Sequence, residues 1–135
     1  MRKPILFVAA AALLAVPAAA QRREDRDARN GNGNANPSAV IAAEIAFAQL
    51  AQAKGQWTAF KETAAPDAVL FTPAMVLAQA WLRNRPNPAH AVAWQPHQVW
   101  SSCDGSLMVT TGAWQNAGKT GWFTTVWQRQ NKGGY

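Results

Sequence analysis

Residues 97–130 read HQVWSSCDGSLMVTTGAWQNAGKTGWFTTVWQRQ, and the pattern of this segment indicates the fold class. It contains three runs rich in Thr, Val and Trp, which are residues that favour strands. Asp104 and Gly105 separate the first two runs and are typical of a tight hairpin turn, whereas residues 116–121 indicate a looser turn. The sequence therefore predicts an antiparallel meander. Its three strands are His97–Cys103, Leu107–Trp114 and Trp122–Gln130.

The residues before the meander predict a long helix from Ala39 to Lys54. Ala-rich sequence supports the helix, Ser38 is expected to cap its first turn, and Gly55 is expected to end it. Large apolar residues recur along it at helical spacing. They are Val40, Ile41, Ile45 and Phe47.

Shorter elements are expected between this helix and the meander. The pattern predicts a short helix at 56–64, a short strand at 68–71 that Pro73 closes, and one helical turn at 78–82. The whole stretch 38–135 therefore reads as one α+β domain.

Composition limits the chemistry that is available. The chain has 135 residues, a formal net charge of +6, seven Trp and one Cys. One Cys excludes an internal disulfide and any metal site with several cysteine ligands. His90 and His97 are separated by a spacing that no common metal site uses. We expect no metal and no cofactor.

The N-terminus has the pattern of an export signal. Arg2 and Lys3 precede an apolar run of about a dozen residues, followed by a proline and three alanines. This run is too short to span a membrane. We therefore predict a signal peptide at 1–20, cleaved between Ala20 and Gln21, which leaves no membrane anchor and a periplasmic or secreted protein.

Residues 21–37 read QRREDRDARNGNGNANP and are predicted to be a disordered linker. Their charges alternate in sign, and they contain no large apolar residue to offset the entropy of ordering.

Five motifs in order resemble the nuclear-transport-factor-2-like superfamily, and within it the SnoaL-like and ketosteroid-isomerase-like proteins, specifically exported bacterial members of unknown function. This resemblance implies a cone-shaped fold in which N-terminal helices pack on the concave face of a curved antiparallel sheet. The motifs are Gly55-Gln56-Trp57, Ala65-Pro66-Asp67-Ala68-Val69, Ser102-Cys103-Asp104-Gly105-Ser106-Leu107, Thr111-Gly112-Ala113-Trp114 and Thr125-Val126-Trp127.

The resemblance also implies one more strand after the Gly133-Gly134 turn. The sequence stops at Tyr135, so the last strand is expected to be missing and 122–130 is expected to be an edge strand. Because an open edge favours pairing with another chain, a homodimer is an expected partner.

The isomerase branch carries a carboxylate base immediately before a proline, and the matching residue here is Thr72. Threonine cannot take a proton from carbon near neutral pH, so this mechanism lacks its base. Asp67 matches an acid in the preceding turn, where turn formation is the usual role. No catalytic residue is therefore predicted; if the protein is an enzyme, His97 is the first candidate for the base, because the ordinary pKa of histidine lies near working pH.

Aromatic residues and small polar residues in the domain predict a pocket for an apolar ligand. Strand alternation leaves two choices for the face that lines it. One face carries Met108, Thr110, Gly112 and Trp114, and would place His97 beside Trp114; the other carries Trp100, Val109 and Thr111. The candidate ligand-binding residues are Trp57, Trp81, His97, Thr110, Trp114 and Trp127.

Two functions follow from these observations. The first is an exported, non-catalytic protein that binds a small apolar or aromatic molecule. The alternative is an enzyme of the isomerase, cyclase or dehydratase type that acts on a small apolar substrate. Nucleic acid is not an expected partner, because only Arg83 and Arg85 lie close together among the cations of the domain.

Overall fold

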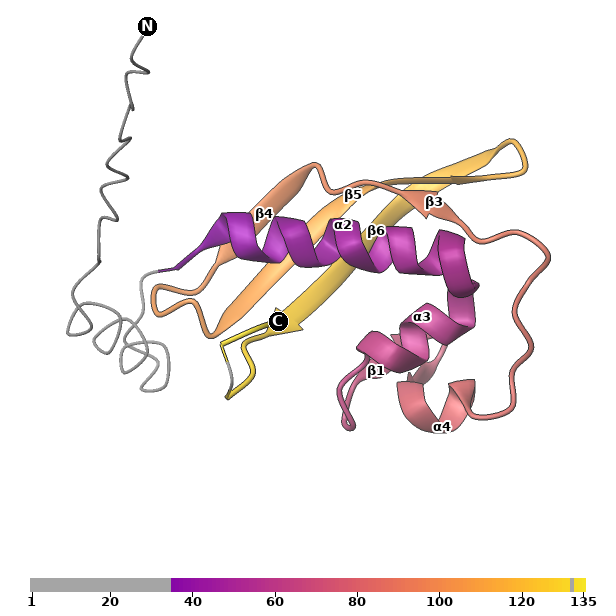
Figure 1. Ribbon diagram of the computed structural model, residues 1–135, viewed down its shortest axis with the longest axis horizontal. Helices are drawn as coiled ribbons and strands as arrows, with labels where there is room; N and C mark the ends of the chain where they lie inside the picture. The colour runs from indigo at the N-terminus through magenta and orange to yellow at the C-terminus, as the bar shows by residue number, and fades with distance from the viewer. Residues whose placement is uncertain (1–34, 132) are drawn as a thin grey trace, which may run out of the picture.

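The computed structural model describes residues 35–131 and 133–135. The predicted signal peptide, its cleavage site and most of the predicted linker lie outside them. The described chain is mixed α+β with antiparallel sheets, which confirms the predicted class. Its long helix α2 (Pro37–Lys54) lies across one face of the larger sheet, and α3 (Gln56–Thr63) and α4 (Ala78–Leu82) follow at one end (Figure 1).

Helix α2 begins two residues earlier than predicted. The side chain of Asn36 accepts a 3.2 Å hydrogen bond from the backbone N–H of Ala39, and Pro37 occupies the first helical turn. The prediction that Ser38 is the cap is therefore wrong: Ser38 lies inside the helix, because the proline is already fixed in a helical conformation. Gly55 ends the helix as predicted, with a φ of 97° that glycine adopts without strain.

The larger sheet is built around β5 (Leu107–Asn116). It pairs with β6 (Lys119–Gln128) along one side, and with β3 (Ala93–Trp94) and β4 (Gln98–Ser101) along the other. Ala117 and Gly118 connect β5 to β6 with φ values of 46° and 77°, so this turn is tighter than the predicted one.

A separate hairpin precedes α4. It consists of β1 (Val69–Phe71) and β2 (Met75–Leu77), and it forms a two-stranded sheet of its own. The sequence predicted β1 but neither β2 nor β3, because strands of two or three residues are too short to show alternation.

The register decides which face of the sheet meets the helices. Met108 pairs with Trp127, and both are buried with Val40 and Phe47 of α2. The inner face is therefore the one that carries Met108, Thr110, Gly112 and Trp114. The opposite face, with Trp100 and Val109, points away from α2.

One extra residue between β3 and β4 interrupts the pairing of this segment with β5. Trp94 pairs with Trp114 and Gln98 pairs with Thr111, so three residues of one strand face two of the other, which is a β-bulge. The bulge reverses the alternation that placed His97 beside Trp114. His97 lies on the outer face, with its ring centroid 6.3 Å from that of Trp122.

The C-terminal residues fold back beside the β4–β5 turn. The hydroxyl of Tyr135 donates a 2.8 Å hydrogen bond to the carbonyl of Gly105, and its ring packs against the core. Among the described residues β6 pairs with β5 alone, so its second edge is open. None of the described helices combines the length and the apolar character needed to cross a bilayer.

Candidate functional site

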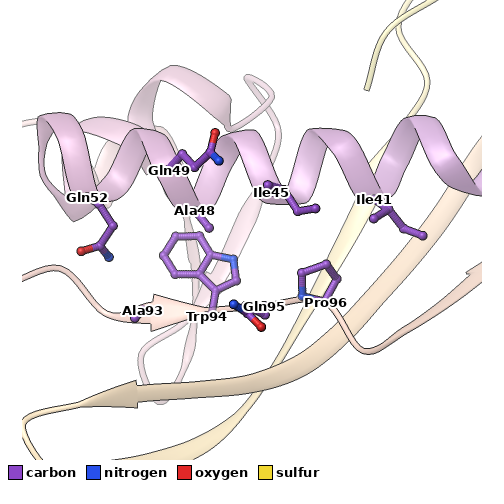
Figure 2. A pocket seen from close by; sticks show the side chains of 9 residues that line it. All are labelled: Ile41, Ile45, Ala48, Gln49, Gln52, Ala93, Trp94, Gln95 and Pro96. Carbon is purple, nitrogen blue, oxygen red and sulfur yellow. The ribbon is translucent and has the colours of Figure 1, made fainter.

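The candidate site is a groove of about 480 Å³ between α2 and the segment that contains β3 (Figure 2). Successive turns of α2 form one wall, and the β3 segment with the bulge that follows it forms the other. The α2 wall consists of Ile41, Ile45, Ala48, Gln49 and Gln52, and the opposite wall consists of Ala93, Trp94, Gln95 and Pro96.

The walls are apolar and the polar groups are amides. Gln49, Gln52 and Gln95 are the polar residues that line the groove, and none of its lining residues is ionisable. The amide nitrogen of Gln52 donates a 2.8 Å hydrogen bond to the carbonyl of Val92, which ties α2 to the β3 segment. Apolar walls with a few amides suit a neutral or weakly polar molecule.

Trp94 forms the aromatic part of the groove, and its ring is held in place. Figure 2 shows the indole pointing from β3 toward α2. Its Nε1 donates a 2.6 Å hydrogen bond to Oε1 of Glu44, and its ring meets that of Phe47 edge-on at 5.0 Å. Because both contacts already fix the ring, a ligand that binds against it does not have to immobilise this side chain.

Behind this wall lies a buried carboxylate. Glu44 is fully buried and accepts hydrogen bonds from Trp94 Nε1, from Thr110 Oγ1 at 2.5 Å and from Trp127 Nε1 at 2.9 Å. Trp127 Nε1 also lies 3.0 Å from Thr110 Oγ1. These donors compensate the loss of water around the carboxylate. Glu44 therefore serves as a polar centre of the core rather than as an exposed acid.

Sequence reasoning missed the role of Glu44, although a signal was present. The buried residues of α2 are Val40, Glu44, Phe47 and Ala51, which follow helical spacing. A glutamate in the middle of a buried stripe requires donors from elsewhere in the fold, and Trp and Thr side chains of the sheet are suitable donors.

The predicted ligand-binding residues lie in four places. Thr110 and Trp127 contact Glu44 in the core, and His97 lies on the outer face. Trp57 and Trp81 meet edge-on at 5.2 Å between α3 and α4. The indole of Trp114 lies over Gly121, where an added Cβ would be only 2.5 Å from its ring.

None of these six residues lines the groove. The structure brings together two pairs of them, Thr110 with Trp127 and Trp57 with Trp81. The aromatic residue of the groove is Trp94, which is not among the predicted ligand-binding residues. Its position depends on the two-residue strand β3, which pattern alone did not reveal.

The β4–β5 turn contains an acid with a perturbed pKa, Asp104. Hydrogen bonds from Ser102 and from the backbone and side chain of Ser106 lower the pKa of Asp104 to about 2. The side chain stabilises a turn in which Gly105 has a φ of 65°. Asp104 is not among the residues that line the groove, and the hydrogen bonds that it accepts from Ser102 and Ser106 give it a structural role in the turn.

Within residues 35–131 and 133–135, no group of three or more His, Cys, Asp or Glu side chains is placed to hold a metal ion. Comparison with known proteins found no matching family model, no matching curated protein and no matching solved structure. The residues of the groove are therefore the basis on which its function is inferred.

Proposed function

We propose that this protein is an exported, non-catalytic binding protein for a small apolar or aromatic molecule, and that the groove between α2 and β3 is its binding site. The observation that carries the proposal is the fixed Trp94 ring within an apolar groove whose polar residues are amides. Its volume of about 480 Å³ falls in the range typical of small-molecule sites.

A nuclear-transport-factor-2-like fold and a periplasmic or secreted location form part of the same proposal. The order of elements supports the fold, because two N-terminal helices precede a hairpin, a short helix and a long antiparallel meander. The position of α2 across the inner face of the sheet also supports it (Figure 1).

The distribution of ionisable groups favours binding over catalysis. A base must reach the proton that it removes, and the groove is lined by no ionisable side chain. The carboxylate of Glu44 is already engaged by three donors, and His97 lies on the other face of the sheet. The isomerase, cyclase or dehydratase alternative therefore has no base at this groove.

The ligand class follows from the groove lining. Ile41, Ile45 and Pro96 offer apolar contact, and Trp94 offers a ring for stacking. The amides of Gln49 and Gln95 are exposed and offer both a donor and an acceptor. A flat, neutral molecule with one or two hydroxyl or carbonyl groups satisfies all of these contacts.

A calorimetric screen with steroids, terpenes and aromatic acids tests the proposal. Ala48→Leu places added bulk in the groove, whereas Ala42→Leu places the same bulk on an exposed part of α2. A ligand of the groove binds the wild type and Ala42→Leu alike and binds Ala48→Leu about tenfold or more weakly. Gln95→Ala, at an exposed position of the same groove, should weaken binding of hydroxyl-bearing ligands without altering the packing of α2.

Two results would contradict the proposal. The first is that no compound of the panel binds the full chain. The second is that a compound binds but Ala48→Leu and Gln95→Ala leave its affinity unchanged, which would place the binding site elsewhere. Urea unfolding of each variant shows whether the fold is intact before binding is compared.

A further inference from the structure

The outer face of the larger sheet carries two widely exposed tryptophans. Trp122 of β6 retains 68% of its surface, and Trp100 of β4 retains 53%. His97 lies beside Trp122, with the two ring centroids 6.3 Å apart, and extends this aromatic surface. Tryptophans dominate the energetics of cores and interfaces, so two of them left in solvent on one face mark a surface that binds something.

The strand register separates the two indoles. Trp100 lies opposite Val109 of β5, and Val126, which is 67% exposed, continues this row on β6. Trp122 lies opposite Ala113, in a row that is four residues further along β5. Because the two tryptophans are also two strands apart, their Cα atoms lie roughly 16 Å from each other. A single small ring cannot stack on both indoles, so a ligand that uses both is an extended chain.

A polar row lies between the two indoles. It consists of Gln98, Thr111 and Thr124, which lie side by side on β4, β5 and β6. Gln98 and Thr124 are exposed, so their amide and hydroxyl groups can donate and accept hydrogen bonds. None of the outward positions on these three strands is charged, although the chain as a whole has a net charge of +6. The face therefore suits a ligand that is neutral and rich in hydrogen-bonding groups.

Within the described part of the chain, the helices leave this face uncovered. Helix α2 packs on the inner side of the sheet, and α3 and α4 pack against α2, against each other and against β2 (Figure 1). An extended ligand can therefore cross β4, β5 and β6 without meeting a described helix.

We propose that the outer face of β4, β5 and β6 is a second binding site, separate from the groove, for a neutral, extended oligosaccharide or polysaccharide. The faces of a sugar ring carry C–H groups, which stack against the electron-rich face of an indole. The hydroxyl groups around the ring bond to amide and hydroxyl side chains beside it. Trp100 and Trp122 each stack on one sugar ring, and the row that contains Gln98 bonds to the sugars between them.

Other occupants fit this face less well. Nucleic acid and an anionic lipid surface both require cations beside the aromatic residues, and the outward positions of β4, β5 and β6 provide none. A protein partner buries an apolar interface centre, whereas amide and hydroxyl groups separate these two indoles.

Titration calorimetry of the full chain with cellohexaose and chitohexaose, and with the corresponding disaccharides, tests the site. The hexasaccharides are neutral and long enough to reach both indoles, whereas a disaccharide reaches only one. A hexasaccharide that uses both should bind at least about tenfold more tightly than its disaccharide. Trp100→Ala and Trp122→Ala should each weaken hexasaccharide binding at least about tenfold and should remove most of this dependence on length.

Two control variants separate this site from the rest of the molecule. Phe71→Ala is the matched control, because Phe71 on β1 is 74% exposed but belongs to the separate two-stranded sheet. Ala48→Leu fills the groove and should leave hexasaccharide binding unchanged, whatever it does to ligands of the groove. Cys103 is exposed, so the solutions contain a reducing agent to exclude disulfide-linked dimers.

Each outcome decides the proposal. A hexasaccharide that binds the wild type and Phe71→Ala alike, and binds both tryptophan variants more weakly, supports it. Failure of both hexasaccharides to bind overturns it, including the case in which a second copy of the chain covers the face. Binding that survives either tryptophan variant also overturns it, because the ligand then does not span both indoles. Binding that Ala48→Leu abolishes places the sugar in the groove and overturns it as well. Urea unfolding checks that each variant remains folded.

Discussion

The indole nitrogen of Trp94 donates a 2.6 Å hydrogen bond to the carboxylate of Glu44, which lies 50 residues earlier in the chain. Thr110 and Trp127 donate to the same carboxylate from β5 and β6. One side chain of α2 thereby fixes three strands of the sheet and the aromatic wall of the groove. Removing the carboxylate of Glu44 leaves the indole N–H of Trp94 and the hydroxyl of Thr110 without their acceptor.

Glu44→Gln should destabilise the fold by about 1–3 kcal/mol. A glutamine keeps the shape but has a single side-chain acceptor, and its NH2 group must face a donor. The midpoint of urea unfolding measures the change. Glu62→Gln is the control, because Glu62 pairs with Lys54 at 3.1 Å on the surface and should contribute less than about 1 kcal/mol. Equal effects of the two changes would contradict a special role for Glu44.

Asn87→Ala should destabilise α3 and the loop that precedes β3. Gly55 precedes α3 and has no side chain to cap it, and Oδ1 of Asn87 instead accepts hydrogen bonds from the N–H groups of Trp57 at 2.7 Å and Thr58 at 3.1 Å. Loss of a cap costs about 1–2 kcal/mol, which urea unfolding detects.

Asn36→Ala is the comparison for this change. Asn36 caps the exposed start of α2 with a single side-chain hydrogen bond of 3.2 Å. We expect Asn36→Ala to destabilise the fold less than Asn87→Ala does. If Asn36→Ala lowers the free energy of unfolding more, the contacts of Asn87 are not the main cap of α3.

The parts of the fold that the sequence predicted are those with a strong local pattern. Helix α2 shows apolar residues at helical spacing and a glycine at its end, and β5 and β6 consist of residues that favour strands. Such signals act over a few residues and need no knowledge of the tertiary structure.

The candidate site could not be predicted because it depends on contacts between distant segments. The bulge after Trp94 is set by the pairing of β3 and β4 with β5, and it moved His97 to the outer face. The donors of Glu44 come from three strands far along the chain. The helical spacing of α2 is compatible with a buried Glu44, but it carries no information about which side chains donate hydrogen bonds to that carboxylate.

The β4–β5 turn should lose stability in acid through Asp104. The pKa of its carboxyl is about 2 in the folded chain, below the ordinary value of 3.8, because Ser102 and Ser106 donate hydrogen bonds to it. A group with a lowered folded pKa contributes stability above its unfolded pKa and loses it as the pH falls through the folded one. The contribution is therefore complete at pH 5 and above and is lost toward about pH 2.

Urea unfolding of the wild type and Asp104→Asn at several pH values measures this effect. The difference between them should be largest near neutral pH and should shrink below about pH 4. Ser102→Ala removes the hydrogen bond that is the largest cause of the lowered pKa of Asp104. It should therefore narrow the pH range over which the free energy of unfolding changes. If the difference in unfolding free energy between wild type and Asp104→Asn does not change with pH, the titration of Asp104 is not the source of the acid sensitivity.

Gly112→Ala should be among the most destabilising single changes in the sheet. The bulge brings the carbonyl oxygen of Gln95 so close that an added Cβ would lie 1.9 Å from it and 2.9 Å from Cε1 of Phe123. Because the obstacle is backbone, the β3–β4 segment must move, and overpacking of this kind costs roughly 1–3 kcal/mol or more. The same movement displaces Gln95 and Pro96 in the groove, so ligand affinity should fall together with the midpoint of urea unfolding. Gly134→Ala is the control, because no heavy atom lies within 4 Å of its added Cβ. If both variants unfold at the wild-type midpoint, β3 and β4 do not approach β5 through this bulge, and the groove that depends on it has a different shape.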